Sequence, residues 1–146
     1  MNFKKLFLKY CKDNQYEINQ NQLIIIEELK NYYIENFGQN LITKIFKKKN
    51  KKPCFYLMGD VGVGKTMILN FFFDNLKEKK LRLHFNEFML NFHDFVFKNK
   101  DNFKENVVDQ FVKDLGIKLK ILYFDEFQVT NIVDAMILGK LFKKII

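Results

Sequence analysis

The sequence predicts an α/β fold in which a parallel sheet is flanked by helices. Short apolar runs alternate along the chain with longer stretches of helical periodicity, the pattern of successive strand–helix units. A glycine-rich turn also follows one apolar run and leads directly into a helical stretch. Together these observations favour a parallel sheet, in which ligands bind at the carboxyl edge of the strands.

Two helices are expected before the sheet. Apolar residues recur at helical spacing within residues 3–10, which predicts a short amphipathic helix. A second helix is expected at about residues 20–37, because Gly38 is a stop signal. The lysine-rich run 47–52 precedes Pro53, and like charges next to a proline predict a polar connection.

After Pro53 the pattern becomes that of a sheet. Residues 54–58 form a short apolar run typical of a strand buried on both faces. The elements expected next are helix 65–79, strand 81–85, helices 87–98 and 103–115, strand 119–124 and helix 131–146. The chain is therefore predicted to comprise an N-terminal helical segment, residues 1–52, and an α/β part, residues 53–146.

Composition bounds the class of protein. A chain of 146 residues with 48% hydrophobic residues can bury one core. The net charge of +8 comes from scattered lysines and the single arginine Arg82. Such a charge permits contact with nucleic acid or anionic lipid, but we expect these residues simply to form a solvated surface. No apolar stretch is long enough for a membrane span. Cys11 and Cys54 lack metal-like spacing, so a reducing compartment is expected.

The central motif is an eight-residue match to G-x-x-x-x-G-K-[ST], the Walker A pattern. Its residues are Gly59, Asp60, Val61, Gly62, Val63, Gly64, Lys65 and Thr66. Glycines let the backbone wrap closely around phosphate oxygens, and the amides with the helix N-terminus form an anion-binding concavity. Lys65 is expected to reach the β- and γ-phosphates of ATP, and the Thr66 hydroxyl to ligate Mg²⁺.

A second motif ends the strand predicted at residues 119–124. Asp125 and Glu126 follow its apolar residues as a Walker B pair, 60 residues after Lys65. That spacing is enough for the succession strand–helix–strand–helix–strand, so both motifs are expected at one sheet edge. Asp125 is predicted to support Mg²⁺, and Glu126 to orient and deprotonate the attacking water.

Three segments resemble the ZapE-like (AFG-type) family of AAA+ ATPases. They are residues 56–67, residues 84–90 together with His93, and residues 124–138, which read Phe-Asp-Glu-Phe-Gln-Val-Thr-Asn-Ile-Val-Asp-Ala-Met-Ile-Leu. Gln22 resembles the glutamine of the family's Asp-Pro-x-Gln stretch near the nucleotide base, although Asn19 and Gln20 replace its first two residues. Asn131 stands where the family usually has aspartate.

The resemblance implies an AAA+ fold, ATP hydrolysis and a ring-like homo-oligomer acting on a protein substrate. In bacteria the family is associated with the division ring, which implies a cytoplasmic protein; in mitochondria it is linked to turnover of inner-membrane proteins, with peripheral membrane contact as an option. The family's motor roles fall on Lys65, Thr66, Asp125 and Glu126. His84 and His93 are expected to be ordinary packing residues, with an interaction surface as the alternative.

Relative to the family, the chain resembles an N-terminal fragment that ends before the sensor strand, the arginine finger and the lid. Arg82 lies in a strand, where a finger is not expected, so we expect the isolated chain to hydrolyse ATP very slowly and to aggregate. Two alternatives stay open: a nucleic-acid-associated ATPase such as a helicase loader, and a nonhydrolysing nucleotide-dependent adaptor.

Overall fold

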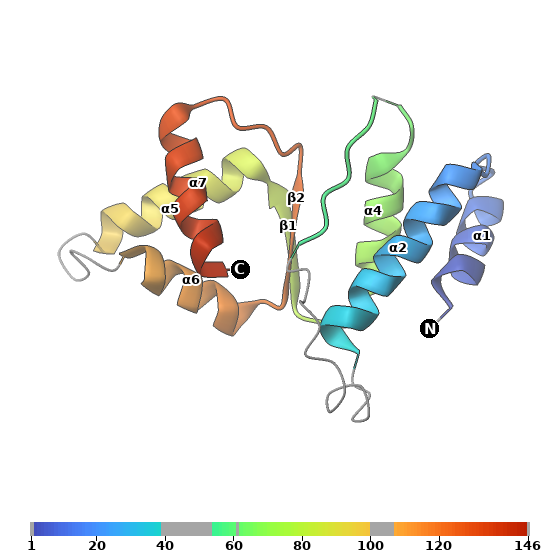
Figure 1. Cartoon of the computed structure of the whole chain (residues 1–146), viewed down its shortest axis with the longest axis horizontal. Helices are drawn as coiled ribbons and strands as arrows, with labels where there is room; N and C mark the ends of the chain where they lie inside the picture. The colour runs from blue at the N-terminus through green and yellow to red at the C-terminus, as the bar shows by residue number, and fades with distance from the viewer. Residues whose placement is uncertain (1, 39–53, 61, 100–106, 146) are drawn as a thin grey trace. The chain divides into compact units, whose positions relative to one another are not determined.

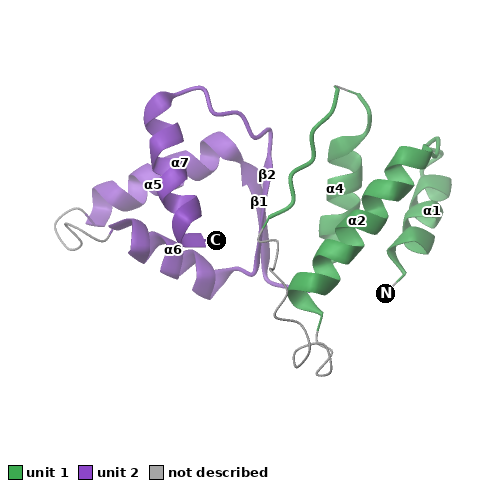
Figure 2. Ribbon diagram, viewed as in Figure 1, with its two compact units in different colours: residues 1–76 green, residues 77–146 purple. Residues whose placement is uncertain are grey.

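The chain forms two compact units, Met1–Leu76 and Lys77–Ile146, called unit 1 and unit 2 below (Figure 2). The structure, a computed structural model, describes residues 2–38, 54–60, 62–99 and 107–145. The boundary predicted between residues 52 and 53, and the polar connection at 47–53, lie outside these residues. The division into segments 1–52 and 53–146 therefore stays a prediction.

The described residues of unit 1 form the helices α1 (Phe3–Asp13), α2 (Gln20–Phe37) and α4 (Lys65–Asp74) (Figure 1). The two helices predicted before the sheet are thus confirmed. Side chains cap both of them: Asn2 Oδ1 accepts from the Lys5 amide at 3.0 Å at the start of α1. Asn19 and Gln22 form a capping box at the start of α2, which satisfies amides that have no partner within the helix.

An aromatic core joins α1 to α4 in unit 1. Phe3, Phe7 and Cys11 are spaced four residues apart on α1 and are at most 1% exposed, so they form one apolar stripe. The Phe3 ring centroid lies 5.1 Å from that of Phe72, and the Phe7 centroid 5.1 Å from that of Phe71. This packing fixes α4, the helix that begins at Lys65.

Unit 2 is built on a parallel pair of strands, β1 (Lys80–His84) and β2 (Ile121–Asp125). Helices α5 (Phe85–Asn99) and α6 (Val107–Lys118) connect them, and α7 (Ile132–Ile145) follows β2 (Figure 1). In the strand register, Arg82 pairs with Tyr123 and His84 with Asp125. The predicted alternation of strands and helices is confirmed in the described residues of unit 2; the predicted helix start at residue 103 and helix end at residue 146 lie outside them.

One face of this strand pair is covered by phenylalanines from the helices. Phe88 of α5 is 2% exposed, and its ring centroid lies 4.8 Å from Phe124 of β2 and 5.7 Å from Phe111 of α6. Leu83 of β1 and Leu141 of α7 are buried in the same cluster. The strands are therefore apolar on this face, which leaves residues 82, 84, 123 and 125 to the opposite one.

The strand predicted at residues 54–58 is wrong. Residues 54–60 form no strand, and the sheet in the described part of the chain consists of β1 and β2. Exposure alternates along the segment: Phe55 and Leu57 are half-buried, whereas Tyr56 is 69% and Met58 82% exposed. A buried strand needs a neighbouring strand to satisfy its amides and carbonyls, and this segment pairs with neither β1 nor β2.

The helix predicted at 65–79 ends earlier, at Asp74. Asn75 Nδ2 donates to the Phe71 carbonyl at 2.8 Å and closes the last turn, and the Lys79 carbonyl already accepts from the Lys120 amide at 2.7 Å. The backbone just before β1 therefore already hydrogen-bonds to the residue before β2, so the helix cannot extend to residue 79. Among the described residues, no helix has the length and apolar character needed to cross a membrane.

The unit 2 core generates a stability prediction. We expect Phe88→Ala to lower the free energy of unfolding by about 3–5 kcal/mol, because it removes a buried ring from between Phe111 and Phe124. Leu90→Ala, on the same helix at 65% exposure, should change it by less than about 0.5 kcal/mol. Urea denaturation monitored by circular dichroism measures both, and equal effects would contradict this packing.

Candidate functional site

The predicted phosphate loop leads into α4 within unit 1. Gly62 has φ 83° and Gly64 φ 84°, in the left-handed region where residues with a Cβ are strained. Gly64 is the N-cap of α4, and its carbonyl accepts from the Ile68 amide at 3.0 Å. Since glycine has no side chain to cap the helix, the first amides of α4 stay available to an anion at this end.

Lys65 crosses back over the start of the loop. Its Nζ donates to the Gly59 carbonyl at 2.7 Å and to the Asp60 carbonyl at 2.5 Å. The ammonium group is thus held at the loop by two neutral acceptors. An entering phosphate could replace these carbonyls as the acceptor of the same hydrogen bonds, with a stronger charge-assisted interaction.

The remaining loop residues are solvent-accessible. Asp60, Gly62, Val63 and Thr66 are exposed, which is the state required of groups that contact a ligand from solution. Val61 lies outside the described residues.

Gln22 contacts this loop, a position that periodicity and composition did not indicate. Its Oε1 accepts from the Asn19 amide at 3.4 Å in the capping box of α2. Its Nε2 lies 3.0 Å from the position that a Cβ at Gly64 would occupy. The capping box therefore holds the Gln22 amide against the loop, so α2 contributes to the same site. The signal in the sequence was the resemblance of Gln22 to the family's glutamine.

The predicted acidic pair lies at the carboxyl end of β2 in unit 2. Asp125 is the last strand residue, and its side chain is 14% exposed. Glu126 follows with φ 51° and a side chain that is 77% exposed. The left-handed backbone at Glu126 turns the chain out of the strand, the change of direction expected for two adjacent acids that serve one site. That they share one sheet edge with Lys65 involves both units and stays a prediction.

Each acid has a basic partner on β1. The Arg82 guanidinium donates from Nη2 to Asp125 Oδ2 and forms an ion pair with it. His84 Nδ1 lies 3.7 Å from Glu126 Oε2. Because His84 and Asp125 are register partners, the ends of both strands present a compact group of two acids and two bases.

Tyr123 completes this group. The Arg82 Cζ atom lies 5.4 Å from the centroid of the Tyr123 ring, so the guanidinium contacts both the ring and the Asp125 carboxylate. Burial, followed by the nearby negative charge of Asp125, raises the pKa of Tyr123 to about 12. The phenol therefore stays neutral through the physiological pH range. The signals for this arrangement were the strand period of two and the isolated arginine in a lysine-rich chain.

Both histidines differ from the expectation of packing residues. The side chains of His84 and His93 are 58% and 46% exposed. His93 Nε2 of α5 lies 3.2 Å from Asp134 Oδ1 of α7, and so links two helices at their surface. His84 lies at the end of β1 and His93 at the surface between α5 and α7, so neither ring packs in the core.

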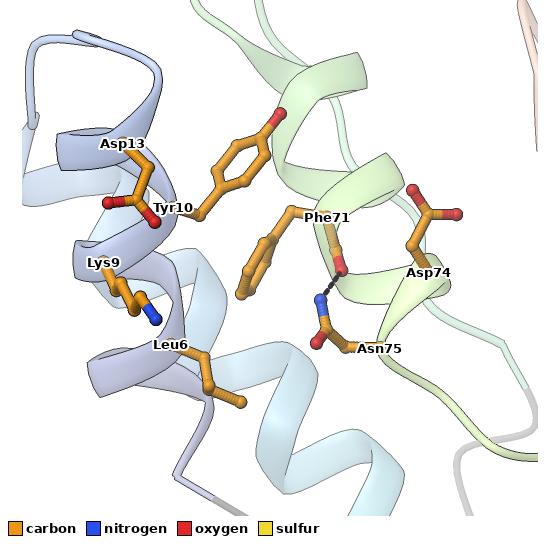
Figure 3. Close-up of a pocket in the computed structure, with 7 residues that line it drawn as sticks. All are labelled: Leu6, Lys9, Tyr10, Asp13, Phe71, Asp74 and Asn75. Atoms are coloured by element: carbon orange, nitrogen blue, oxygen red, sulfur yellow. Dashed lines mark hydrogen bonds between the residues drawn. The ribbon is translucent and has the colours of Figure 1, made fainter.

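Unit 1 also has a hollow of about 330 Å³ (Figure 3). It opens between α1 and the C-terminal end of α4, where Asp74 and Asn75 line it. Lys65 and Asp74 are the two ends of α4. At 1.5 Å per residue they are about 14 Å apart along the helix. The hollow is therefore separate from the phosphate loop.

The donor chemistry of the predicted metal ligands fits Mg²⁺. The Thr66 hydroxyl and the Asp125 carboxylate are hard oxygen donors, and Mg²⁺ takes one or two protein oxygens together with water and phosphate. Within the described residues, no three His, Cys, Asp or Glu side chains gather as a metal cage. Each residue suits the ion by its donor type, and that both hold one ion stays a prediction because they lie in different units.

Comparison with known proteins gives the family. A family model described as AFG1-like ATPase matches residues 8–146. The cell division protein ZapE of Escherichia coli (strain K12) is 40% identical over 91 residues, which cover 60% of this chain and 23% of that protein. Lactation elevated protein 1 homolog B of Danio rerio is 34% identical over 106 residues, which cover 66% of this chain and 21% of that protein.

An uncharacterized protein of Schizosaccharomyces pombe is also 34% identical over 93 residues, covering 60% of this chain and 20% of that protein. This chain thus spans about a fifth of the length of these relatives. No solved structure matches. The family model covers nearly all of the sequence, including the loop at residues 59–66 and the acids at 125 and 126. The chain belongs to the AFG1-like ATPase family.

Proposed function

We propose that this protein binds ATP with Mg²⁺ through residues 59–66 and hydrolyses it, as an AAA+ ATPase that remodels other proteins. The observation that carries the proposal is the loop in unit 1. Two left-handed glycines leave the start of α4 accessible, and the Lys65 ammonium is held over the loop by the carbonyls of Gly59 and Asp60. This combination of amides and one cation suits a polyphosphate.

In the proposed reaction, Lys65 transfers its hydrogen bonds from the two carbonyls to phosphate oxygens. Thr66 and Asp125 would hold Mg²⁺, and the ion would supply neutralisation of the phosphate charge. Glu126, exposed at the end of β2, accepts a proton from the attacking water. The backbone turn at Glu126 supports this role because it carries the side chain beyond the strand end.

The biological role is proposed from the relatives. The E. coli relative is a cell division protein, which supports a role connected with cell division. With that role we propose a protein substrate and a cytoplasmic location. We propose that the protein works as a homo-oligomer, because AAA+ motors complete their sites between subunits.

Two substitutions separate binding from turnover in the full-length protein. Lys65→Ala should weaken ATP binding at least about tenfold, because a charge-assisted contact to phosphate is worth about 1.5–3 kcal/mol. Glu126→Gln should keep ATP affinity within about twofold and lower turnover about 10²–10⁴-fold, since it removes the general base. Fluorescent-nucleotide titration and phosphate release measure the two effects.

Lys113→Ala is the matched control, because Lys113 is exposed on α6 and its loss changes net charge equally. Unchanged affinity and turnover in Lys65→Ala would refute the proposal. Unchanged turnover in Glu126→Gln would show that Glu126 is not the general base. ATP binding unchanged by Glu126→Gln, together with an absence of turnover in the unmodified full-length protein, would favour a nonhydrolysing adaptor.

Loop conformation gives a further prediction. Gly64→Ala should weaken ATP binding about tenfold, because a Cβ at φ 84° adds about 1–2 kcal/mol of strain and would meet Gln22 Nε2 at 3.0 Å. Gly116→Ala, in α6 with nothing within 4 Å of its Cβ position, should leave binding unchanged and raise stability by up to about 1 kcal/mol. Calorimetric titration and thermal unfolding test both; equal affinities would show that the left-handed turn is dispensable.

A further inference from the structure

The acid predicted to support Mg²⁺ is held by a side chain to which neither motif assigns a role. Arg82 lies on β1 opposite Tyr123, and Asp125 is two residues further along β2 on the same face. The guanidinium therefore reaches diagonally across the strand pair to Asp125 Oδ2, with its Cζ atom 5.4 Å from the Tyr123 ring centroid. One planar group thus contacts a ring and a carboxylate.

We propose that Arg82 is a positioning residue that orients the Asp125 carboxylate for the Mg²⁺–nucleotide complex. This inference rests on the proposed function and deepens it. The Asp125 side chain is only 14% exposed, and a polar group that is largely removed from water needs a hydrogen-bond partner. Arg82 provides that partner from the neighbouring strand, so the position of the acid depends on the β1–β2 register.

The contacts favour positioning over competition with the metal. A cation that merely blocked the acid would need to move away when Mg²⁺ arrives. The Tyr123 ring instead contacts the guanidinium, and the Arg82 side chain is 38% exposed, so solvent screens its repulsion of a nearby ion. We therefore expect the guanidinium to stay in place and the carboxylate to keep one orientation.

Composition supports a need for arginine at this place. Of 25 basic residues in the chain, Arg82 is the single arginine. Lysine carries the same charge, but its ammonium is a point donor without a plane to stack on an aromatic ring. The position between the ring and the carboxylate suits a planar donor, and lysine has no planar group.

The test measures how strongly Mg²⁺ changes nucleotide affinity, without reference to turnover. The affinity of the full-length protein for a fluorescent ATP analogue is measured once in Mg²⁺ and once in EDTA. The ratio of the two affinities is then compared between the unmodified protein and its variants. We expect Arg82→Gln to reduce this ratio about tenfold and Arg82→Lys to reduce it less, while the affinity in EDTA stays unchanged. Lys120→Gln, with the same loss of charge at an exposed residue beside β2, should leave the ratio unchanged.

A double-mutant cycle shows whether Arg82 acts through Asp125. In the background of Asp125→Asn, Arg82→Gln should have no further effect on the ratio. A ratio unchanged in both Arg82 variants would overturn the proposal, as would a higher ratio, which means that Arg82 competes with Mg²⁺. Equal loss of affinity in Mg²⁺ and in EDTA would show a structural role and overturn it too.

The charge-conserving Arg82→Lys keeps the test usable if Arg82→Gln does not fold. Measurements on the unmodified protein distinguish a failure of the proposed function from a failure of the Arg82 inference. If it binds no nucleotide in a Mg²⁺-dependent way, the proposed function fails and this inference with it. If it binds normally and the Arg82 variants behave like it, the inference alone fails.

Discussion

The left-handed turns at Gly62 and Gly64 are the constraint on which the candidate site in unit 1 depends. They leave the start of α4 accessible, and Lys65 then spans the loop to the carbonyls of Gly59 and Asp60. A phosphate-binding loop needs a rigid base. Here the base is aromatic, since α4 packs through Phe71 and Phe72 onto α1. An N-terminal helix far from the motif in sequence thereby fixes the helix that carries it.

Unit 2 holds two acids, Asp125 and Glu126, at the end of the short strand β2. The phenylalanine cluster around Phe88 covers one face of β1 and β2, and the opposite face carries Arg82, Tyr123 and Asp125. The acids are therefore paired with bases from β1 rather than left as isolated charges. The same parallel register that builds the sheet thus also assigns each acid its partner.

Local signals predicted much of this chain, and the failures have physical causes. The helix at residues 20–37 was predicted to the residue because its stop signal, Gly38, is local. The prediction of a strand at residues 54–58 was wrong because an apolar run indicates a preference for an extended backbone. It does not show that a neighbouring strand is present to form hydrogen bonds. Likewise, the loop and the acids were visible as motifs, whereas the contact of Arg82 with Asp125 arises between strands and depends on register.

The central claim is that residues 59–66 grip a triphosphate, and amide hydrogen exchange in the full-length protein tests it most directly. Bound phosphate would occupy the amides at the start of α4, which no side chain of Gly64 caps. Saturating ATP with Mg²⁺ should therefore slow exchange markedly in the peptide that spans residues 62–68, and far less in the helix α6. If nucleotide left exchange at residues 62–68 unchanged while binding elsewhere, the loop would not be the binding site.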